Sequence, residues 1–261
     1  MILLFVNIFL MATYISKENE ARNDEMMLKE DITGILSGRG ISVSPEMIPS
    51  DSIVLSSVIV KKESGVKLVA ERLFGDVSET IDEKNTIYSS EKGNIMFSGD
   101  SFSLVFESER EIDSAESAER LAETIARKLS VPTARSEFET EKSSGNWVVR
   151  VPQMQSGLRV FDCFIEFKIF PNGSVMAHGK FIGKGSVQKL RRDMKRTSAI
   201  LLDFADEMEK RNEDFVVIKK ISLGYASVSR SAEITILMPA IEIETGGGVF
   251  CISMENGKII Q

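Results

Sequence analysis

Histidine and cysteine, the side chains that most often carry catalysis or bind metals, are scarce in this sequence. Its 261 residues contain one histidine, His178, and nucleophilic catalysis of the Ser-His-Asp or Cys-His kind needs a histidine to move the proton. Because His178 follows a strand pattern directly and precedes Gly179, we expect an exposed residue without a catalytic role. One histidine also excludes the common polyhistidine metal sites. We expect no catalytic residue, no metal ligand and no cofactor.

The two cysteines, Cys163 and Cys251, are far apart and lack the paired spacing of a zinc site or a redox Cys-x-x-Cys motif. Both lie in apolar strand patterns, where a cysteine usually behaves as a small buried hydrophobic residue. We therefore expect two buried thiols, with a disulfide between them as the alternative.

Two further motifs have simple structural interpretations. The run Gly246-Gly-Gly248 lacks the lysine of a phosphate loop and precedes no helical pattern, so it indicates a hairpin turn rather than a nucleotide site. Carboxylates are plentiful, as a glycosidase with paired acids requires, but they are scattered over predicted helix faces and turns. A glycosidase is thus a minor alternative.

Charge and composition limit the class of protein. A net charge of -7 opposes binding to a phosphate backbone, so nucleic acid is not an expected partner. Hydrophobic residues at 43% and charged residues at 27% are ordinary for a folded globular chain. A local basic cluster is expected to be a solvated face, the alternative being contact with acidic lipid or cell-wall polymer. It comprises Lys189, Arg191, Arg192, Lys195 and Arg196.

The first fifteen residues, Met1 to Ile15, carry no charge, and a stretch of mixed charge from Lys17 to Glu25 ends this apolar run. A cleaved signal peptide would show a basic start and an Ala-x-Ala-like site, and a buried soluble helix would show a polar face. The run has none of these features. We therefore favour an uncleaved signal anchor over residues 1–16, although about 22 Å of helix is short of a roughly 30 Å hydrocarbon core. This predicts a single-pass protein of the cell membrane, with most of the chain extracytoplasmic.

The rest of the sequence predicts an α+β fold in three modules, because strands cluster after each helix instead of alternating with helices. Module 24–110 has an apolar helical stripe over 24–37, a strand over 53–60, a short helix that Ser64 caps, and strands near 86–90, 94–98 and 102–107. Module 111–186 begins with the capping pattern Asp113-Ser-Ala-Glu116 and a helix that continues towards Pro132. Its strands are predicted near 136–140, 146–151 and 158–170, then a hairpin at Asn172-Gly173.

Module 187–261 repeats the same pattern, which suggests a duplicated unit. A helix carries Ile200, Leu201, Phe204 and Met208 on one face, and strands follow near 215–222, 224–230, 232–244 and 249–252. In the long strand of the middle module, alternation places Phe161, Cys163, Ile165, Phe167 and Ile169 inward. Phe164 interrupts the polar outer face of that strand, so we expect part of this face to be covered.

Several of these segments carry a family resemblance. They are the apolar run ending in Asn7-Ile-Phe-Leu10, the segment Leu36-Ser-Gly-Arg-Gly-Ile41, Gly157-Leu-Arg-Val-Phe161 with its hairpin, and Gly224-Tyr225 leading to Met238-Pro239. In this layout the chain resembles the YycH/YycI family, YycI more closely. These are membrane-anchored regulators found with an essential cell-wall two-component system of Gram-positive bacteria. The resemblance implies a non-enzymatic extracytoplasmic regulator that binds a sensor histidine kinase and pairs with a YycH-like protein or a second copy of itself.

The helix-and-sheet modules are also similar to PepSY-type domains, which implies an alternative function, an inhibitor or chaperone of a peptidase. For the kinase regulator, the expected partner-binding residues lie on the apolar helix: Phe5, Asn7, Ile8 and Phe9. Asn7 is notable because an amide in an apolar helix is commonly satisfied across a helix interface.

Overall fold

The computed structural model describes residues 2–62, 65–82, 85–108, 110–180, 182, 185–190, 193–213, 215–229 and 234–260. The chain forms two compact units, each assembled from separated segments. We call them the α1 unit (Met1–Leu55, Asp193–Leu223 and Ile241–Gln261) and the α3 unit (Ser56–Arg192 and Gly224–Ala240). This division cuts across the three modules expected from the sequence, because strands β12 (Val216–Ser229) and β13 (Ile234–Thr245) each contribute residues to both units.

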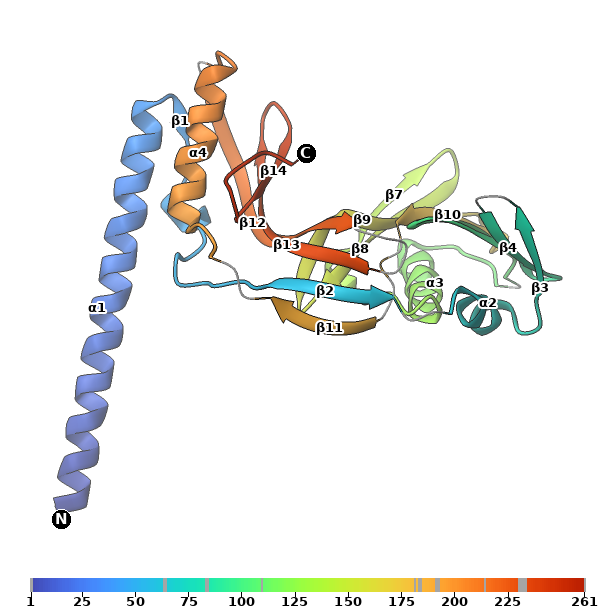
Figure 1. Cartoon of the computed structure of the whole chain (residues 1–261), viewed down its shortest axis with the longest axis horizontal. Coiled ribbons are helices and arrows are strands. Elements are labelled where there is room, and N and C mark those ends of the chain that lie inside the picture. The colour runs from blue at the N-terminus through green and yellow to red at the C-terminus, as the bar shows by residue number, and fades with distance from the viewer. Residues whose placement is uncertain are drawn as a thin grey trace. The chain divides into compact units, whose positions relative to one another are not determined.

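The chain is an α+β protein with an N-terminal helix and a mixed sheet, in agreement with the predicted class (Figure 1). Besides those two strands, the elements of the α1 unit are α1 (Ile2–Gly38), β1 (Ile41–Ser42), η1 (Pro45–Met47), α4 (Thr197–Lys210) and β14 (Val249–Ser253). The α3 unit contains β2 (Ser57–Lys62), α2 (Val66–Phe74), β3 (Ser78–Asp82), β4 (Asn85–Ser90), β5 (Gly93–Ser98), β6 (Ser101–Phe106), α3 (Ala115–Lys128), η2 (Arg135–Glu137), β7 (Glu139–Ser143), β8 (Asn146–Gln155), β9 (Leu158–Ile169), β10 (Val175–Lys180) and β11 (Gly185–Leu190).

Helix α1 is one continuous helix, where the sequence suggested an apolar segment and a separate helix over 24–37. The helix ends at Gly38. Two residues later Gly40 adopts the left-handed conformation, with φ 79°, which glycine tolerates because it has no Cβ atom. The chain then enters β1, which pairs in parallel with β12 through Ile41 and Val216. The charged stretch after Ser16 therefore extends the helix instead of ending it.

The predicted membrane anchor over residues 1–16 is wrong. Within the part of the chain that the structure describes, no helix combines the length and the apolar character needed to cross a membrane. The physical reason lies in α1 itself. Its apolar run ends at Ile15, after about 22 Å of helix, and the charged residues from Lys17 onward continue the same helix where a roughly 30 Å apolar span would be required.

The core of the α1 unit forms where the C-terminal end of α1 meets α4 (Figure 1). Ile32 and Leu36 of α1 are buried with Leu201 and Phe204 of α4, over an inner surface supplied by the strands. Arg196, the N-cap residue of α4, makes no side-chain capping bond. Instead the carboxylate of Asp51 accepts hydrogen bonds from the Ser198 backbone N–H at 2.9 Å and from the Ser198 hydroxyl at 2.6 Å. The loop that carries Asp51, far from α4 in sequence, thus provides the acceptor for a backbone N–H of the first helical turn that has no partner within the helix.

The α3 unit is built on an antiparallel sheet with the strand order β7-β8-β9-β10-β6-β5-β4-β3. Helices α2 and α3 contact each other and pack on strands of this sheet (Figure 1). Helix α3 begins as the sequence predicted, although the capping box joins Ser114 to Ser117. The predicted cap of α2, Ser64, lies outside the described residues, and the N-cap is Gly65.

Strand β9 shows where simple alternation fails. Cys163, Ile165, Phe167 and Ile169 are buried as predicted, but Phe161 is only half-buried and Val160 takes the inward position. The change coincides with a register shift between Pro152 and Met154 of the neighbouring β8. Such a shift re-aims the side chains that follow it. Phe164 is covered, as expected, because the Arg150 guanidinium stacks 3.7 Å from its ring centroid.

Strand β12 is one long strand, where two strands over 215–222 and 224–230 were predicted. The glycine that suggested a break, Gly224, instead permits a close approach to β9. A Cβ atom at this position would lie 2.5 Å from the Arg159 carbonyl oxygen and 2.5 Å from the Phe161 ring. In the same part of the sheet, the Asp162 carboxylate accepts a hydrogen bond from the Ser227 backbone N–H at 2.8 Å.

Both cysteines are buried thiols, which confirms the sequence-based expectation. Cys163 lies in the α3 unit and Cys251 in the α1 unit. Burial raises the pKa of Cys163 to about 12, so this thiol stays protonated at neutral pH.

Candidate partner-binding surface

Helix α1 has a packed C-terminal part and an exposed N-terminal part. Every side chain from Thr13 to Asp24 is exposed, and so are Asn7, Leu10 and Met11. The exposed apolar side chains are large, with exposed fractions of 59% at Leu10, 66% at Met11 and 69% at Tyr14. Contiguous apolar surface of this kind is uncommon on soluble monomers and marks interaction sites.

The helical repeat places the exposed apolar side chains in line with the packed ones. Tyr14 precedes Ile32 by about five turns at 3.6 residues per turn, and Met11 precedes Lys29 by the same interval. Asn7 stands in the same relation to Glu25. The face of α1 that carries Ile32 and enters the core therefore continues towards the N-terminus as Asn7, Met11 and Tyr14. We call these three residues the exposed α1 face.

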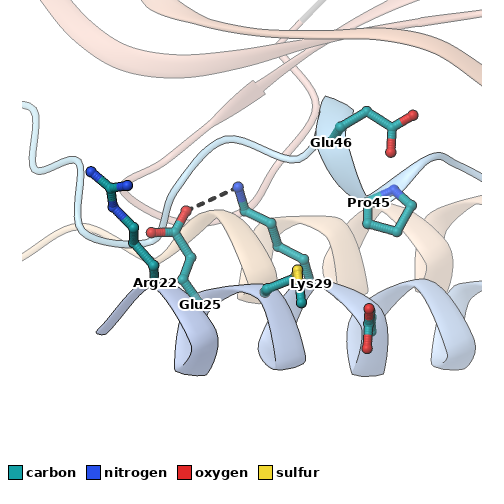
Figure 2. A pocket seen from close by; sticks show the side chains of 7 residues that line it. Arg22, Glu25, Lys29, Pro45 and Glu46 are labelled. Atoms are coloured by element: carbon teal, nitrogen blue, oxygen red, sulfur yellow. Dashed lines mark ion pairs between the residues drawn. The ribbon is translucent and has the colours of Figure 1, made fainter. Parts of the chain in front are cut away.

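A pocket of about 460 Å³ lies on this line, between α1 and η1 (Figure 2). Figure 2 shows Arg22, Glu25 and Lys29 on successive turns of α1, with Pro45 and Glu46 opposite. The lining residues are Arg22, Glu25, Met26, Lys29, Glu30, Pro45 and Glu46. The pocket thus combines side chains of both charges with the apolar surfaces of a methionine and a proline.

Two charged groups of the pocket, Glu25 and Lys29, hold each other in place. Lys29 Nζ lies 2.9 Å from Glu25 Oε1, an ion pair across one helical turn (Figure 2). The hydrogen bond from Lys29, with a smaller contribution from Ser50, lowers the pKa of Glu25 below its usual value. A hydrogen bond from Ser44 lowers the pKa of Glu46 in the same direction. Both carboxylates are therefore ionised at neutral pH, and the pocket offers fixed charges of both signs.

The residues predicted to bind a partner all lie on α1, but the structure describes only part of their surroundings. The Asn7 side chain is exposed. Phe5, Ile8 and Phe9 belong to the helix by their backbone, while their side chains lie outside what the structure describes. The structure therefore places these four residues on one helix and brings Asn7 into line with the pocket residue Glu25.

His178 is exposed, as predicted, with 67% of its side chain accessible. It lies opposite Glu166 on β9, and its Nε2 atom is 3.8 Å from Glu166 Oε1. The glycines 246–248 form the turn between β13 and β14, with the Thr245 N–H bonded to the Gly248 oxygen at 2.8 Å. Among the described side chains, no group of three or more histidine, cysteine or acidic residues is arranged to hold a metal ion.

The predicted basic cluster is described only in part. Lys195 pairs with Asp203 at 2.7 Å, and Arg196 is exposed. The side chains of Lys189, Arg191 and Arg192 lie outside the described residues.

Sequence reasoning did not find the pocket. Arg22, Glu25 and Lys29 belong to a stretch that was interpreted as the end of an apolar segment and the start of a separate helix. A usable signal was the spacing of opposite charges four residues apart, Glu18 with Arg22 and Glu25 with Lys29, which is typical of one continuous exposed helix. Nothing in the spacing alone points to Pro45 and Glu46, which the turn after α1 brings back towards the helix.

No protein-family model matches the chain. No curated protein matches it either. A crystal structure of an uncharacterized protein from Eubacterium rectale is similar over 85% of this chain and 89% of that chain, with a TM-score of 0.52 and 12% sequence identity. The C-terminal domain of YpeB from Bacillus megaterium matches 77% of this chain and 97% of that domain, with a TM-score of 0.41 and 11% identity. The first likeness shows a shared fold alone, and the second is too low to support an inference.

Proposed function

We propose that this chain is a non-enzymatic regulatory protein that binds another protein along α1. The observation that carries the proposal is the exposed α1 face, whose apolar side chains continue the line of buried residues at the other end of the same helix. An amphipathic partner helix laid along such a face buries its apolar side chains at intervals of three and four residues. The pocket next to this face supplies fixed charges that define the register and direction of the partner.

The class of partner comes from the resemblance to the YycH/YycI family in the segments Leu36 to Ile41 and Gly157 to Phe161. It suggests a sensor histidine kinase of a cell-wall two-component system. Regulation then requires that the contact favour one signalling state of the kinase, because a ligand with equal affinity for both states shifts nothing. Binding activates the kinase if its active state exposes the helix that fits the exposed α1 face, and inhibits the kinase if its inactive state does.

Site-specific crosslinking tests the proposal and identifies the partner. A photoreactive amino acid is placed at Met11 in the full chain, and in a second variant at Met27, and crosslinked products are identified by mass spectrometry. These two methionines form a matched pair. Their exposed fractions are 66% and 62%, and they lie about four and a half turns apart, on opposite sides of α1.

We expect a sensor histidine kinase to be crosslinked from position 11 and not from position 27. A peptidase crosslinked from position 11 would instead favour the PepSY-like inhibitor or chaperone. Equal products from both positions, or none from either, would contradict a specific partner-binding face on α1.

A further inference from the structure

The middle of α1 carries an excess of negative charge. Residues 17–31 contain six carboxylates and three cations, and the structure describes all of them. Of the cations, Lys17 and Arg22 are exposed and Lys29 is half-buried. The carboxylates, all exposed except the half-buried Glu25, are Glu18, Glu20, Asp24, Glu25, Glu30 and Asp31. An exposed surface with an excess of one charge attracts a partner surface of the opposite charge.

Ion pairs within the helix do not remove this excess. Arg22 Nη2 lies 2.6 Å from Glu18 Oε1, and Lys29 is paired with Glu25. Each pair uses one cation and one carboxylate, so residues 17–31 retain four carboxylates and one cation, Lys17. Among the described residues, no salt bridge engages these four carboxylates. They are available to the cations of a partner.

The pocket between α1 and η1 shows the same imbalance. Three carboxylates line it, and one of them, Glu25, is paired with Lys29. The other two, Glu30 of α1 and Glu46 of η1, are exposed and form no ion pair with any described residue. Figure 2 shows Glu46 on the wall opposite Glu25 and Lys29. A cation that enters the pocket therefore meets two carboxylates that no cation of this chain occupies.

The apolar part of the pocket suits the stem of a basic side chain. Met26 and Pro45 line the pocket together with the charged groups. Lysine and arginine lay their aliphatic stems against apolar surface while the charged end contacts polar groups. The pocket lies on the line of α1 that leads to Met11 and Tyr14, and about 18 Å of helix separates Met26 from Tyr14. One partner helix of ordinary length can therefore contact both.

We propose that the partner segment that binds α1 is a basic amphipathic helix. Its apolar side chains contact Met11 and Tyr14, its lysines and arginines lie along residues 17–31, and one of these cations enters the pocket beside Glu30 and Glu46. This inference rests on the proposed function and specifies the chemistry of the partner. A second copy of this chain is a poor occupant, because two acidic stretches laid side by side repel each other.

Fluorescence polarisation with the full chain tests the chemistry of the partner. The probes are two labelled, end-capped peptides that share leucines at helical spacing and differ only in the polar face, which is lysine in one and glutamate in the other. Because charge complementarity is required, we expect the glutamate peptide to bind at least about tenfold more weakly. Rising salt should weaken binding of the lysine peptide, since exposed charges are screened.

Matched charge reversals locate the contact. Glu46→Lys and Glu30→Lys should each weaken binding of the lysine peptide by about tenfold. Glu209→Lys is the control and should change it by less than about twofold, although it alters the net charge equally. Glu209 is exposed on α4, about 16 Å along that helix from Ser198, which lies beside Glu25. Circular dichroism and melting curves confirm that each variant is folded, and either pocket variant suffices should the other not fold.

Two outcomes would overturn the basic helix: equal binding of the lysine and glutamate peptides, and equal loss for Glu209→Lys and the pocket variants. Crosslinking from position 11 separates this failure from that of the proposed function. If the partner is still crosslinked there at full yield in Glu46→Lys and Glu30→Lys, α1 binds a partner but the basic anchor is refuted. If positions 11 and 27 give equal products, the binding face on α1 is refuted and the inference that rests on it falls as well.

Discussion

The two ends of α1 carry similar residues in different surroundings. Ile32 and Leu36 are buried beneath α4, whereas Met11 and Tyr14, on the same side of the helix, are exposed. The buried end is stabilised by tertiary packing, and each fully buried large apolar side chain contributes about 1.5 to 3 kcal/mol. The exposed end depends on helix propensity, which is marginal for isolated helices in water. The difference shows that one helix can serve both as part of a core and as a binding surface.

Hydrogen exchange should reveal the largest contrast between the two ends. Amides near Ile32 and Leu36 are expected to exchange at least about a thousandfold more slowly than those near Tyr14, because opening the packed end breaks the core while the other end opens locally. Exchange measured by NMR or mass spectrometry on the free chain checks this. Uniform protection along α1 would show that the exposed end is stabilised in a way that its exposure does not explain.

Removing a side chain from the core that packs on α1 should destabilise the protein far more than removing one from the exposed end of α1. Phe204 on α4 is 1% exposed, and Phe204→Ala is expected to destabilise the α1 unit by about 3 to 5 kcal/mol. Tyr14→Ala removes an aromatic side chain of comparable size from the exposed end and should change stability by less than about 0.5 kcal/mol. Chemical denaturation followed by fluorescence compares them. Similar losses in the free energy of unfolding for both variants would contradict the distinction between a packed end and an exposed end of α1.

Asp51 should have an intermediate effect, because it secures the helix on which α1 packs. Asp51→Ala leaves the Ser198 N–H at the start of α4 without its acceptor and is expected to cost about 1 to 2 kcal/mol. The matched control is Asp206→Ala, which removes an exposed carboxylate from the same helix and its surface pair with Arg39. Thermal melts should show the smaller loss for the control, and the reverse order would refute the capping role.

The smallest expected effect is the pH dependence of Glu25, at the border between the two ends. Its pKa is depressed in the folded chain, so its contribution to stability is present above the usual value of 4.5 and lost as the pH falls through the lower folded value. Because the pair is at the surface, the contribution is a few tenths of a kcal/mol. Carbon-detected NMR titration should show the lowered pKa, and Lys29→Met should raise it towards 4.5. An unchanged value in that variant would exclude Lys29 as the cause.

Local sequence signals predicted many elements of this fold. The start of α3, the apolar stripe of α4 and the hairpin at Asn172-Gly173 all depend on residues close in sequence, although the capping box of α3 uses Ser114 and Ser117 where Asp113 and Glu116 were predicted. The burial of Cys163 followed from strand alternation in the same way. These features were predictable because the interactions that specify them span only a few residues.

The features that were missed depend on long-range contacts. The inward position of Val160 follows from a register shift in the neighbouring strand, and the capping of Ser198 by Asp51 joins segments far apart in sequence. The membrane anchor was wrongly predicted because residues 1–16 were treated as a segment of their own, whereas they are the first part of a helix that continues through the charged residues to Gly38. The pocket could not be predicted because it forms only where the turn after α1 brings Pro45 back against the helix, and no spacing of residues in the sequence indicates that contact.

The central claim, that α1 binds a partner through the face that includes Met11, is tested most directly by affinity measurements with the crosslinked partner in purified form. Met11→Glu and Met27→Glu place the same charge at equally exposed positions on opposite sides of α1. We predict that Met11→Glu weakens binding at least about tenfold, as burying an unpaired charge in an interface does, while Met27→Glu changes it by less than about twofold. Equal effects of the two substitutions, or none from Met11→Glu, would contradict the claim.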